Sequence, residues 1–99
     1  MIKFKDIHEK CVTHELSVEE TKVLEEVILL TDKAIDSQYQ LYGYVEVDAD
    51  EVHRMFSPFG NFRRSVLLDH WKKECNKHGW TAEYSGGRSN SVWTLRGNI

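Results

Sequence analysis

The sequence predicts a single α+β domain in which helices pack against a small antiparallel sheet. The 99 residues are 40% hydrophobic and 29% charged and contain one proline, a composition typical of one compact folded domain. Apolar residues follow helical spacing in some segments and alternate with period two in others. These patterns predict helices over 18–36, 49–56 and 62–78 and strands over 39–47, 80–84 and 92–95. Two strands at the end of the chain, after mixed earlier elements, favour the α+β class.

Residues 1–16 are predicted to be an N-terminal extension, and residues 17–99 the main domain. Phe4, Ile7 and Cys11 are spaced by three and four positions. This spacing places them on one side of a short helix, which we expect to dock on the domain.

A capping box predicts the start of the first long helix. Ser17 is followed three residues later by a glutamate, so each side chain can satisfy a free amide of the other residue. The helix is predicted over 18–36, with one strongly apolar side. The period then changes to two over 39–47, which predicts a strand. Tyr42 and Tyr44 share one face of that strand, where they cover a second layer or form an exposed patch for a partner.

A second cap and a turn follow. Asp48 is predicted to cap a short helix over 49–56. The proline in 57–61 interrupts that helix, because proline removes a backbone donor and restricts the residue before it. Asn61 is predicted to cap the next helix, over 62–78, which ends before a glycine suited to a left-handed C-terminal position.

The helix over 62–78 has two different sides. The side predicted to face the core carries Leu67, Leu68, Trp71, Cys75 and His78. The side predicted to be basic carries Arg63, Val66, His70, Lys73 and Lys77. The final strands flank a glycine-rich stretch, 85–91, which predicts a hairpin. Trp71 and Trp93 are predicted to pack in the core rather than to stack on single-stranded nucleic acid.

Charge is distributed unevenly along the chain. The net charge is −3, yet residues 1–56 hold six Lys and Arg against thirteen Asp and Glu, a balance of −7. Residues 57–99 hold seven against three, a balance of +4. Such asymmetry indicates an acidic face and a basic binding face on one small domain.

The order of helix, strand, short helix, turn, basic helix and hairpin resembles a winged helix-turn-helix domain. It is similar to the recognition helix and wing of phage and plasmid replication and regulatory proteins. The resemblance covers 17–97 and implies that 49–56 is the first helix of the motif, 57–61 its turn, 62–78 the recognition helix and 85–91 the wing tip. The turn is longer than three or four residues, which leaves the angle between the two helices open.

The resemblance implies a DNA-binding surface, for which the candidate residues are Asn61, Arg63, Arg64, Ser65, His70, Lys72, Lys73, Lys77 and Arg88. The residues that would meet base edges in the major groove, as the start of a recognition helix does, are Asn61, Arg63, Arg64 and Ser65. The lysines would contact phosphates, and Arg88 would reach the minor groove or a phosphate. Arg64 has an alternative role, with its stem packed on the core and its head in water.

Two Cys-x-x-His pairs raise the alternative of a zinc site. Cys11, His14, Cys75 and His78 would complete a tetrahedral set if the N-terminal segment folded onto the long helix. Cys75 and His78 lie on the predicted core side, where cysteine commonly acts as a small hydrophobic residue. No nucleophile stands at motif spacing from a base, and no phosphate loop is present. The sequence therefore predicts a protein without catalytic activity or a required cofactor.

The sequence as a whole predicts a small cytoplasmic protein that binds double-stranded DNA, either a transcriptional regulator or a replication accessory. No membrane association is expected, because the longest aliphatic run, 27–30, is far shorter than the roughly 20 residues of a span. The alternative is an interaction module, such as a small inhibitor or adaptor with a winged-helix body that does not bind DNA. It would contact a partner protein through residues 18–46, and a homodimer is compatible with either function.

Overall fold

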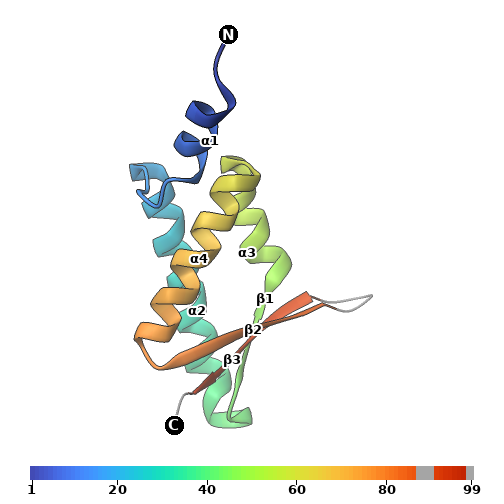
Figure 1. The fold of residues 1–99 in the computed structure, drawn as a ribbon. Coiled ribbons are helices and arrows are strands. Elements are labelled where there is room, and N and C mark those ends of the chain that lie inside the picture. The colour runs from blue at the N-terminus through green and yellow to red at the C-terminus, as the bar shows by residue number, and fades with distance from the viewer. Residues whose placement is uncertain (87–90, 98–99) are drawn as a thin grey trace.

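The computed structural model describes residues 1–86 and 91–97, which form four α-helices, a 3-10 turn and a three-stranded sheet (Figure 1). In chain order the elements are α1 (Phe4–Val12), α2 (Val18–Tyr42), β1 (Val45–Asp48), α3 (Ala49–Phe56), the 3-10 turn (Ser57–Phe59), α4 (Asn61–Lys77), β2 (Trp80–Gly86) and β3 (Ser91–Gly97). The sheet is antiparallel with the order β1, β3, β2, so the strand between α2 and α3 pairs with the last strand. The predicted α+β class is confirmed.

The predicted capping box is present at the start of α2. The Ser17 hydroxyl accepts a hydrogen bond from the Glu20 amide at 3.1 Å, and the Glu20 carboxylate accepts one from the Ser17 amide at 2.9 Å. Two of the amides that a helix start leaves without partners are thereby satisfied. The first long helix therefore begins where the sequence predicts.

The predicted strand over 39–47 is wrong for most of its length. α2 continues to Tyr42 and ends at Gly43, whose φ of 74° is a left-handed conformation that glycine adopts without strain. The Gly43 amide donates to the Tyr39 carbonyl oxygen at 2.8 Å. Nothing before Gly43 breaks the helix, so the alternation of apolar residues there does not produce a strand. Tyr42 consequently ends α2 and Tyr44 precedes β1, so they share no strand face, although their ring centroids lie 6.0 Å apart.

The strand that does form, β1, is short and lies between α2 and β3. Val45 and Val47 are buried while Glu46 and Asp48 are exposed, as period two requires. The Gln38 side chain, on the last turns of α2, accepts from the Glu46 amide at 2.9 Å and donates to the Glu46 carbonyl oxygen at 3.0 Å. These two hydrogen bonds satisfy the backbone amide and carbonyl groups of Glu46, which lie on the edge of the sheet and would otherwise have no partner strand.

The helix pair α3 and α4 is joined as the sequence predicts, except at the cap. Asp48 accepts hydrogen bonds from the Asp50 and Glu51 amides and so caps α3. The proline segment forms the 3-10 turn, and Gly60 occupies the N-cap position of α4 with φ 92°. The predicted cap at Asn61 is wrong, because Asn61 is already the first helical residue and Gly60 takes the cap position.

The last two strands form the expected hairpin and are longer than predicted. β2 and β3 pair from Trp80 with Gly97 to Gly86 with Ser91. The ends of the predicted tip, 85–86 and 91, therefore belong to the strands. The remaining tip, 87–90, lies outside the described residues.

One hydrophobic core connects the sheet with α2, α3 and α4. Its largest fully buried side chains are Val27, Val45, Val52, Phe56, Leu67, Trp71 and Leu95. The Trp71 Nε1 donates to the Thr31 hydroxyl at 3.0 Å, and that hydroxyl donates to the Val27 carbonyl oxygen at 2.8 Å. Trp93 packs edge-on against Trp71, with ring centroids 5.4 Å apart. The prediction that both tryptophans belong to the core is confirmed.

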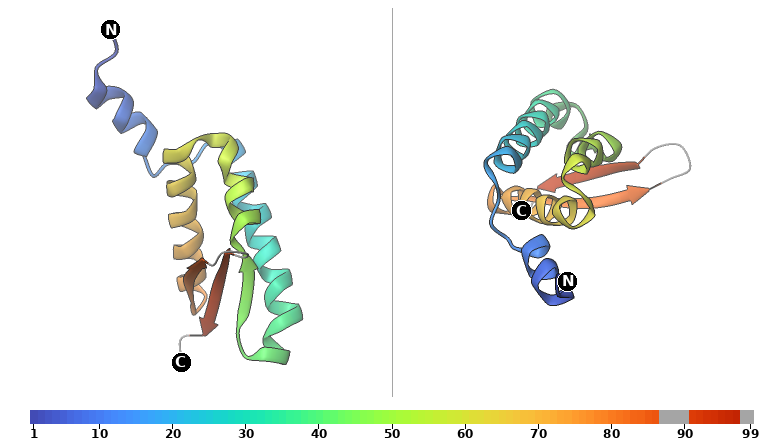
Figure 2. Two further views of the ribbon diagram at one scale, coloured as in Figure 1. Left: turned by 90° about the vertical axis from the view of Figure 1, so that its right-hand side faces the viewer. Right: turned by 90° about the horizontal axis from the view of Figure 1, so that it is seen from above.

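α2 and α4 run side by side, with the sheet near their C-terminal ends (Figure 1). α1 projects away from this body beyond the N-terminal end of α4 (Figure 2). The expected short helix is present and contacts α4 through His8, whose ring centroid lies 5.5 Å from that of Phe62, and through the Cys11 carbonyl oxygen. Phe4 is 77% exposed and Ile7 43%, so the expected burial of these two residues is wrong. Among the described residues, none of the helices combines the length and the apolar character needed to cross a membrane.

Candidate nucleic-acid interface

α4 carries most of the predicted interface, and its sides have different neighbours. Successive residues of an α-helix are rotated by about 100° around its axis, so the pattern of buried residues shows which side of α4 other elements cover. Its buried residues are Val66, Leu67, Trp71 and Cys75. The predicted placement of Val66 on an open basic side is wrong, because that side is partly covered. The predicted core placement of His78 is also wrong: this residue caps the end of α4 and is exposed.

Arg63 is the most fully bonded cation of the site. Its guanidinium donates to both carboxylate oxygens of Glu20, from Nε at 2.7 Å and from Nη2 at 3.1 Å. It also donates to the backbone carbonyl oxygens of Cys11, Thr13 and Glu15. An arginine has five N–H donors, and each of them is used. We call these contacts the Arg63 network.

The Arg63 network is also largely removed from water. The Arg63 side chain is 15% exposed and the Glu20 side chain 6%. The hydrogen bond from Arg63 lowers the pKa of Glu20 below its usual value, against the opposing effect of burial. Arg63 therefore has no donor left for a base edge, and the predicted role as a reader of bases does not fit this geometry. The residue holds the chain before α2 against α4.

His70 makes a second contact between α4 and a backbone carbonyl oxygen of the segment before α2. Its Nε2 lies 2.8 Å from the His14 carbonyl oxygen, and the two imidazole rings are 6.3 Å apart between centroids. The His70 side chain is half-buried. The side of α4 that carries Arg63 and His70 thus faces the segment 11–15 and is not open for a ligand.

The lysines at the end of α4 are exposed and paired with acids on the same helix. Lys73 Nζ lies 3.0 Å from Asp69, and Lys77 Nζ lies 4.0 Å from Glu74. The hydrogen bond from Lys73 is the main reason that the pKa of Asp69 is lowered. Exposed pairs of this kind contribute little to stability. Replacing the carboxylate partner of either lysine by a phosphate therefore costs little free energy.

Lys72 and Arg64 have no ion pair among residues 1–86 and 91–97. Lys72 is exposed, and its Nζ lies 4.7 Å from the centre of the Trp93 ring on β3. This contact directs the ammonium group to the junction of α4 and the hairpin. Arg64 is half-buried near the start of α4, between the covered and open sides.

The open side of α4 carries a row of polar residues. Asn61, Ser65, Lys72 and Asn76 are separated by four, seven and four positions, which places them in one row on a helix, and all four are exposed. The structure therefore brings together the predicted residues Asn61, Ser65 and Lys72, with Lys73 beside them. The remaining predicted residue, Arg88, lies outside the described residues.

Sequence reasoning missed two residues of this surface. Asn76 extends the row, and its position four residues after Lys72 was the available signal. Tyr84 lies opposite Trp93 in the hairpin, is 53% exposed and stacks on His53 of α3 with ring centroids 6.2 Å apart. A tyrosine in a strand facing a tryptophan in its partner indicates such a surface, because aromatic residues pair across strands.

The two Cys-x-x-His pairs lie along different parts of α4: Cys11 lies near its start and His14 near its middle, whereas Cys75 and His78 lie at its end. Cys11 is held at Arg63, whereas Cys75 is twelve residues further along the helix, about 18 Å at 1.5 Å per residue. Burial raises the pKa of the Cys75 thiol to about 11, which fits its predicted core position. No group of three or more His, Cys, Asp and Glu side chains within the described ranges could hold a metal ion. Comparison of the chain with protein-family models, curated proteins and solved structures finds no match.

Proposed function

We propose that this chain is a small DNA-binding protein of winged-helix type. α4 would lie in the major groove, and the hairpin of β2 and β3 would contact the neighbouring backbone. The observation that supports this most is the exposed polar row on α4 directly beside that hairpin. The helix pair α3 and α4, followed by a hairpin whose last strand also pairs with β1, supports the same assignment.

The polar side chains of α4 would make two kinds of contact. Asn61 and Ser65, at the start of α4, are suited to base edges, because an asparagine amide can pair with adenine and a serine hydroxyl is more permissive. Lys72, Lys73 and Lys77 follow along the helix and are suited to phosphates, which fix position without reading sequence. Arg63 and His70 are left out of the interface because they bind the N-terminal segment.

The number of cations on α4 that can contact phosphates predicts how binding depends on salt. With Arg64 and the three lysines of α4 as phosphate contacts, the slope of log K against log salt is expected to be about −3 to −4. A contact from Arg88 would make it steeper by about one. The net charge of −3 weakens association further, so binding is to be measured at low ionic strength.

The test is fluorescence anisotropy of a labelled random-sequence duplex with Lys72→Glu. We expect about tenfold weaker binding or more, because one phosphate contact becomes a repulsion. Lys33→Glu is the matched control: it changes the charge equally, on an exposed position of α2. Urea unfolding of both variants checks that they fold. No binding by the unaltered chain at 20 mM salt, or equal losses for both variants, would contradict the proposal.

A protein-interaction module is the second candidate function. The observation that favours it is a set of large apolar side chains exposed on α2, where acidic residues predominate: Leu29, Tyr39, Leu41 and Tyr42. A partner protein could cover them. Failure to bind DNA together with capture of a partner, and loss of that partner in Leu41→Glu, would favour this function over DNA binding.

A further inference from the structure

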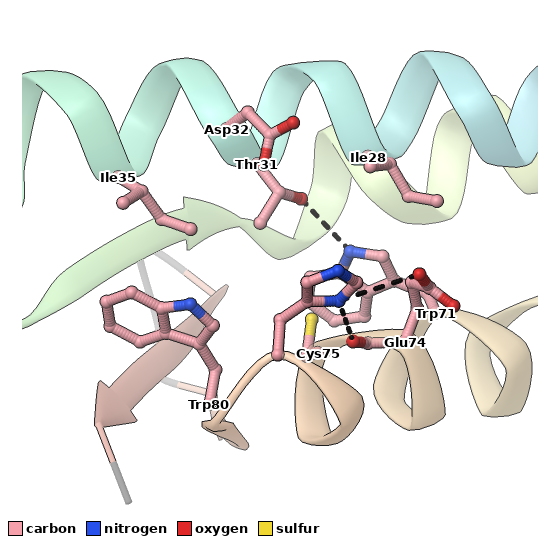
Figure 3. A pocket seen from close by; sticks show the side chains of 9 residues that line it. Ile28, Thr31, Asp32, Ile35, Trp71, Glu74, Cys75 and Trp80 are labelled. Carbon is pink, nitrogen blue, oxygen red and sulfur yellow. Dashed lines mark hydrogen bonds and ion pairs between the residues drawn. The ribbon is translucent and has the colours of Figure 1, made fainter.

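A pocket of about 480 Å³ lies between α2 and the C-terminal half of α4, on a different side of α4 from the exposed row (Figure 3). Ile28 and Ile35 line it from α2, Trp71 from α4 and Trp80 from β2. Its volume is within the range of about 300–1,000 Å³ that small-molecule sites occupy. The pocket is therefore large enough for a small organic molecule.

The aromatic wall offers ring surfaces, and the N–H donor of Trp71 is not available to a ligand. The indole N–H of Trp71 is already donated to Thr31, and the Thr31 hydroxyl is already donated to a backbone carbonyl oxygen of α2. Trp80 is held edge-on by Tyr39, with ring centroids 5.4 Å apart. Apolar groups and cations bind to the faces of such rings.

The polar groups at the rim include two carboxylates and the imidazole of His78, which lies beside Glu74. Asp32 of α2 and Glu74 of α4 lie on opposite sides of the pocket (Figure 3). Glu74 has exposed partners in Lys77 at 4.0 Å and His78 at 3.6 Å, whereas Asp32 has no ion pair within the described part of the chain. Asp32 is thus the carboxylate with free capacity.

The negative potential extends to the floor of the pocket. Burial is the main reason that the pKa of Cys75 is raised to about 11, and the charges of Glu74 and Asp32 add to it. Burial disfavours a charge of either sign, whereas the smaller contributions of Glu74 and Asp32 disfavour only a negative charge. An anionic ligand would meet both carboxylates and no unpaired cation among the lining residues.

We propose that this pocket binds a small organic ammonium ion, with its charged head at Asp32 and its apolar body against the two tryptophan rings. The combination of an unpaired carboxylate with indole faces is the chemistry that recognises such ligands. This inference does not depend on DNA binding, because the pocket and the exposed row share no residue.

The test uses phenethylammonium as the probe, with 2-phenylethanol and 3-phenylpropionate as neutral and anionic analogues. Saturation-transfer NMR and tryptophan fluorescence titrations measure binding to the full chain. We expect saturable binding of the ammonium ion, at least fivefold weaker binding of the alcohol and none of the carboxylate. Equal binding of cation and alcohol, or no binding of the cation at 10 mM, would overturn the proposal.

The residue test is Asp32→Asn, with Asp36→Asn as the matched control. Both positions are exposed on α2, but Asp36 does not line this pocket. We expect Asp32→Asn to weaken phenethylammonium binding about fivefold to tenfold, and Asp36→Asn to change it less than twofold. Equal effects of the two substitutions would show that general charge attraction, not the pocket, binds the probe.

Discussion

Replacing Arg63 by methionine should destabilise the fold strongly, because it removes the centre of the Arg63 network while keeping much of the buried stem. Glu20 would remain in a site where its side chain is 6% exposed, without its cationic partner. Breaking a buried ion pair by removing one partner costs about 3–5 kcal/mol. Glu20 keeps the Ser17 amide as a donor, and Arg63 is 15% exposed. We therefore expect a loss of about 2–4 kcal/mol.

Urea unfolding followed by tryptophan fluorescence measures this loss. Arg64→Met is the matched control, since it makes the same chemical change one residue further along, at a half-buried position without an ion pair in the described chain. A surface substitution of that kind costs about 0.5 kcal/mol. If Arg63→Met loses no more stability than Arg64→Met, the Arg63 network does not hold the fold as we infer.

The same pair of proteins has an expected pH dependence. The pKa of Glu20 is lowered in the folded chain, chiefly by the hydrogen bond from Arg63. A lowered carboxyl pKa adds stability above the unfolded pKa of about 4.3, and that stability is lost as the pH falls through the folded value. The stability difference between the original chain and Arg63→Met should therefore shrink between pH 5 and pH 3. A difference that is constant over this range would refute the electrostatic explanation.

Two further predictions concern the core. Thr31→Val should lower the free energy of unfolding by about 1–3 kcal/mol, measured by urea unfolding, because the buried Trp71 N–H loses its acceptor. A loss below 0.5 kcal/mol would contradict this. The Cys75 thiol, with a pKa of about 11, should react with iodoacetamide at pH 8 about a hundredfold more slowly in the folded chain than in urea, as followed by mass spectrometry. Equal rates in both states would contradict its burial.

Local signals in the sequence predicted most of the helix starts. The serine and glutamate of the capping box and the aspartate before α3 act within one turn, so they work wherever the rest of the chain lies. The predicted strand over 39–47 was wrong for the opposite reason, because the structure there depends on contacts beyond one turn. Alternating apolar residues there are also compatible with a helix, and the end of α2 depends on Gly43 and on the Gln38 side chain that pairs with β1. That pairing joins α2 to β1, and neither segment alone carries a sequence pattern that indicates it.

The candidate site could be predicted only in part. A helical wheel gives the angle of each residue around the helix axis, but not the segments that pack against it. It placed Lys73 and Lys77 correctly as exposed residues, yet it placed Arg63 on the same open side. The guanidinium is covered by three carbonyl oxygens from residues 11–15, which lie about fifty positions earlier in the chain. Backbone carbonyl groups are present at every residue and carry no sequence signal, so this contact needed the folded structure.

The positive balance of residues 57–99 does not become an equally positive surface. Arg63 is neutralised by Glu20 from the acidic half of the chain, while Lys73 and Lys77 lie beside acids on their own helix. The sequence balance counts these cations fully, although the potential that attracts DNA depends on those that remain unpaired and exposed. Lys72 is the one cation on the open side of α4 without an ion pair in the described residues. For this reason Lys72→Glu, rather than a change at Arg63, is the substitution that separates loss of DNA binding from loss of the fold.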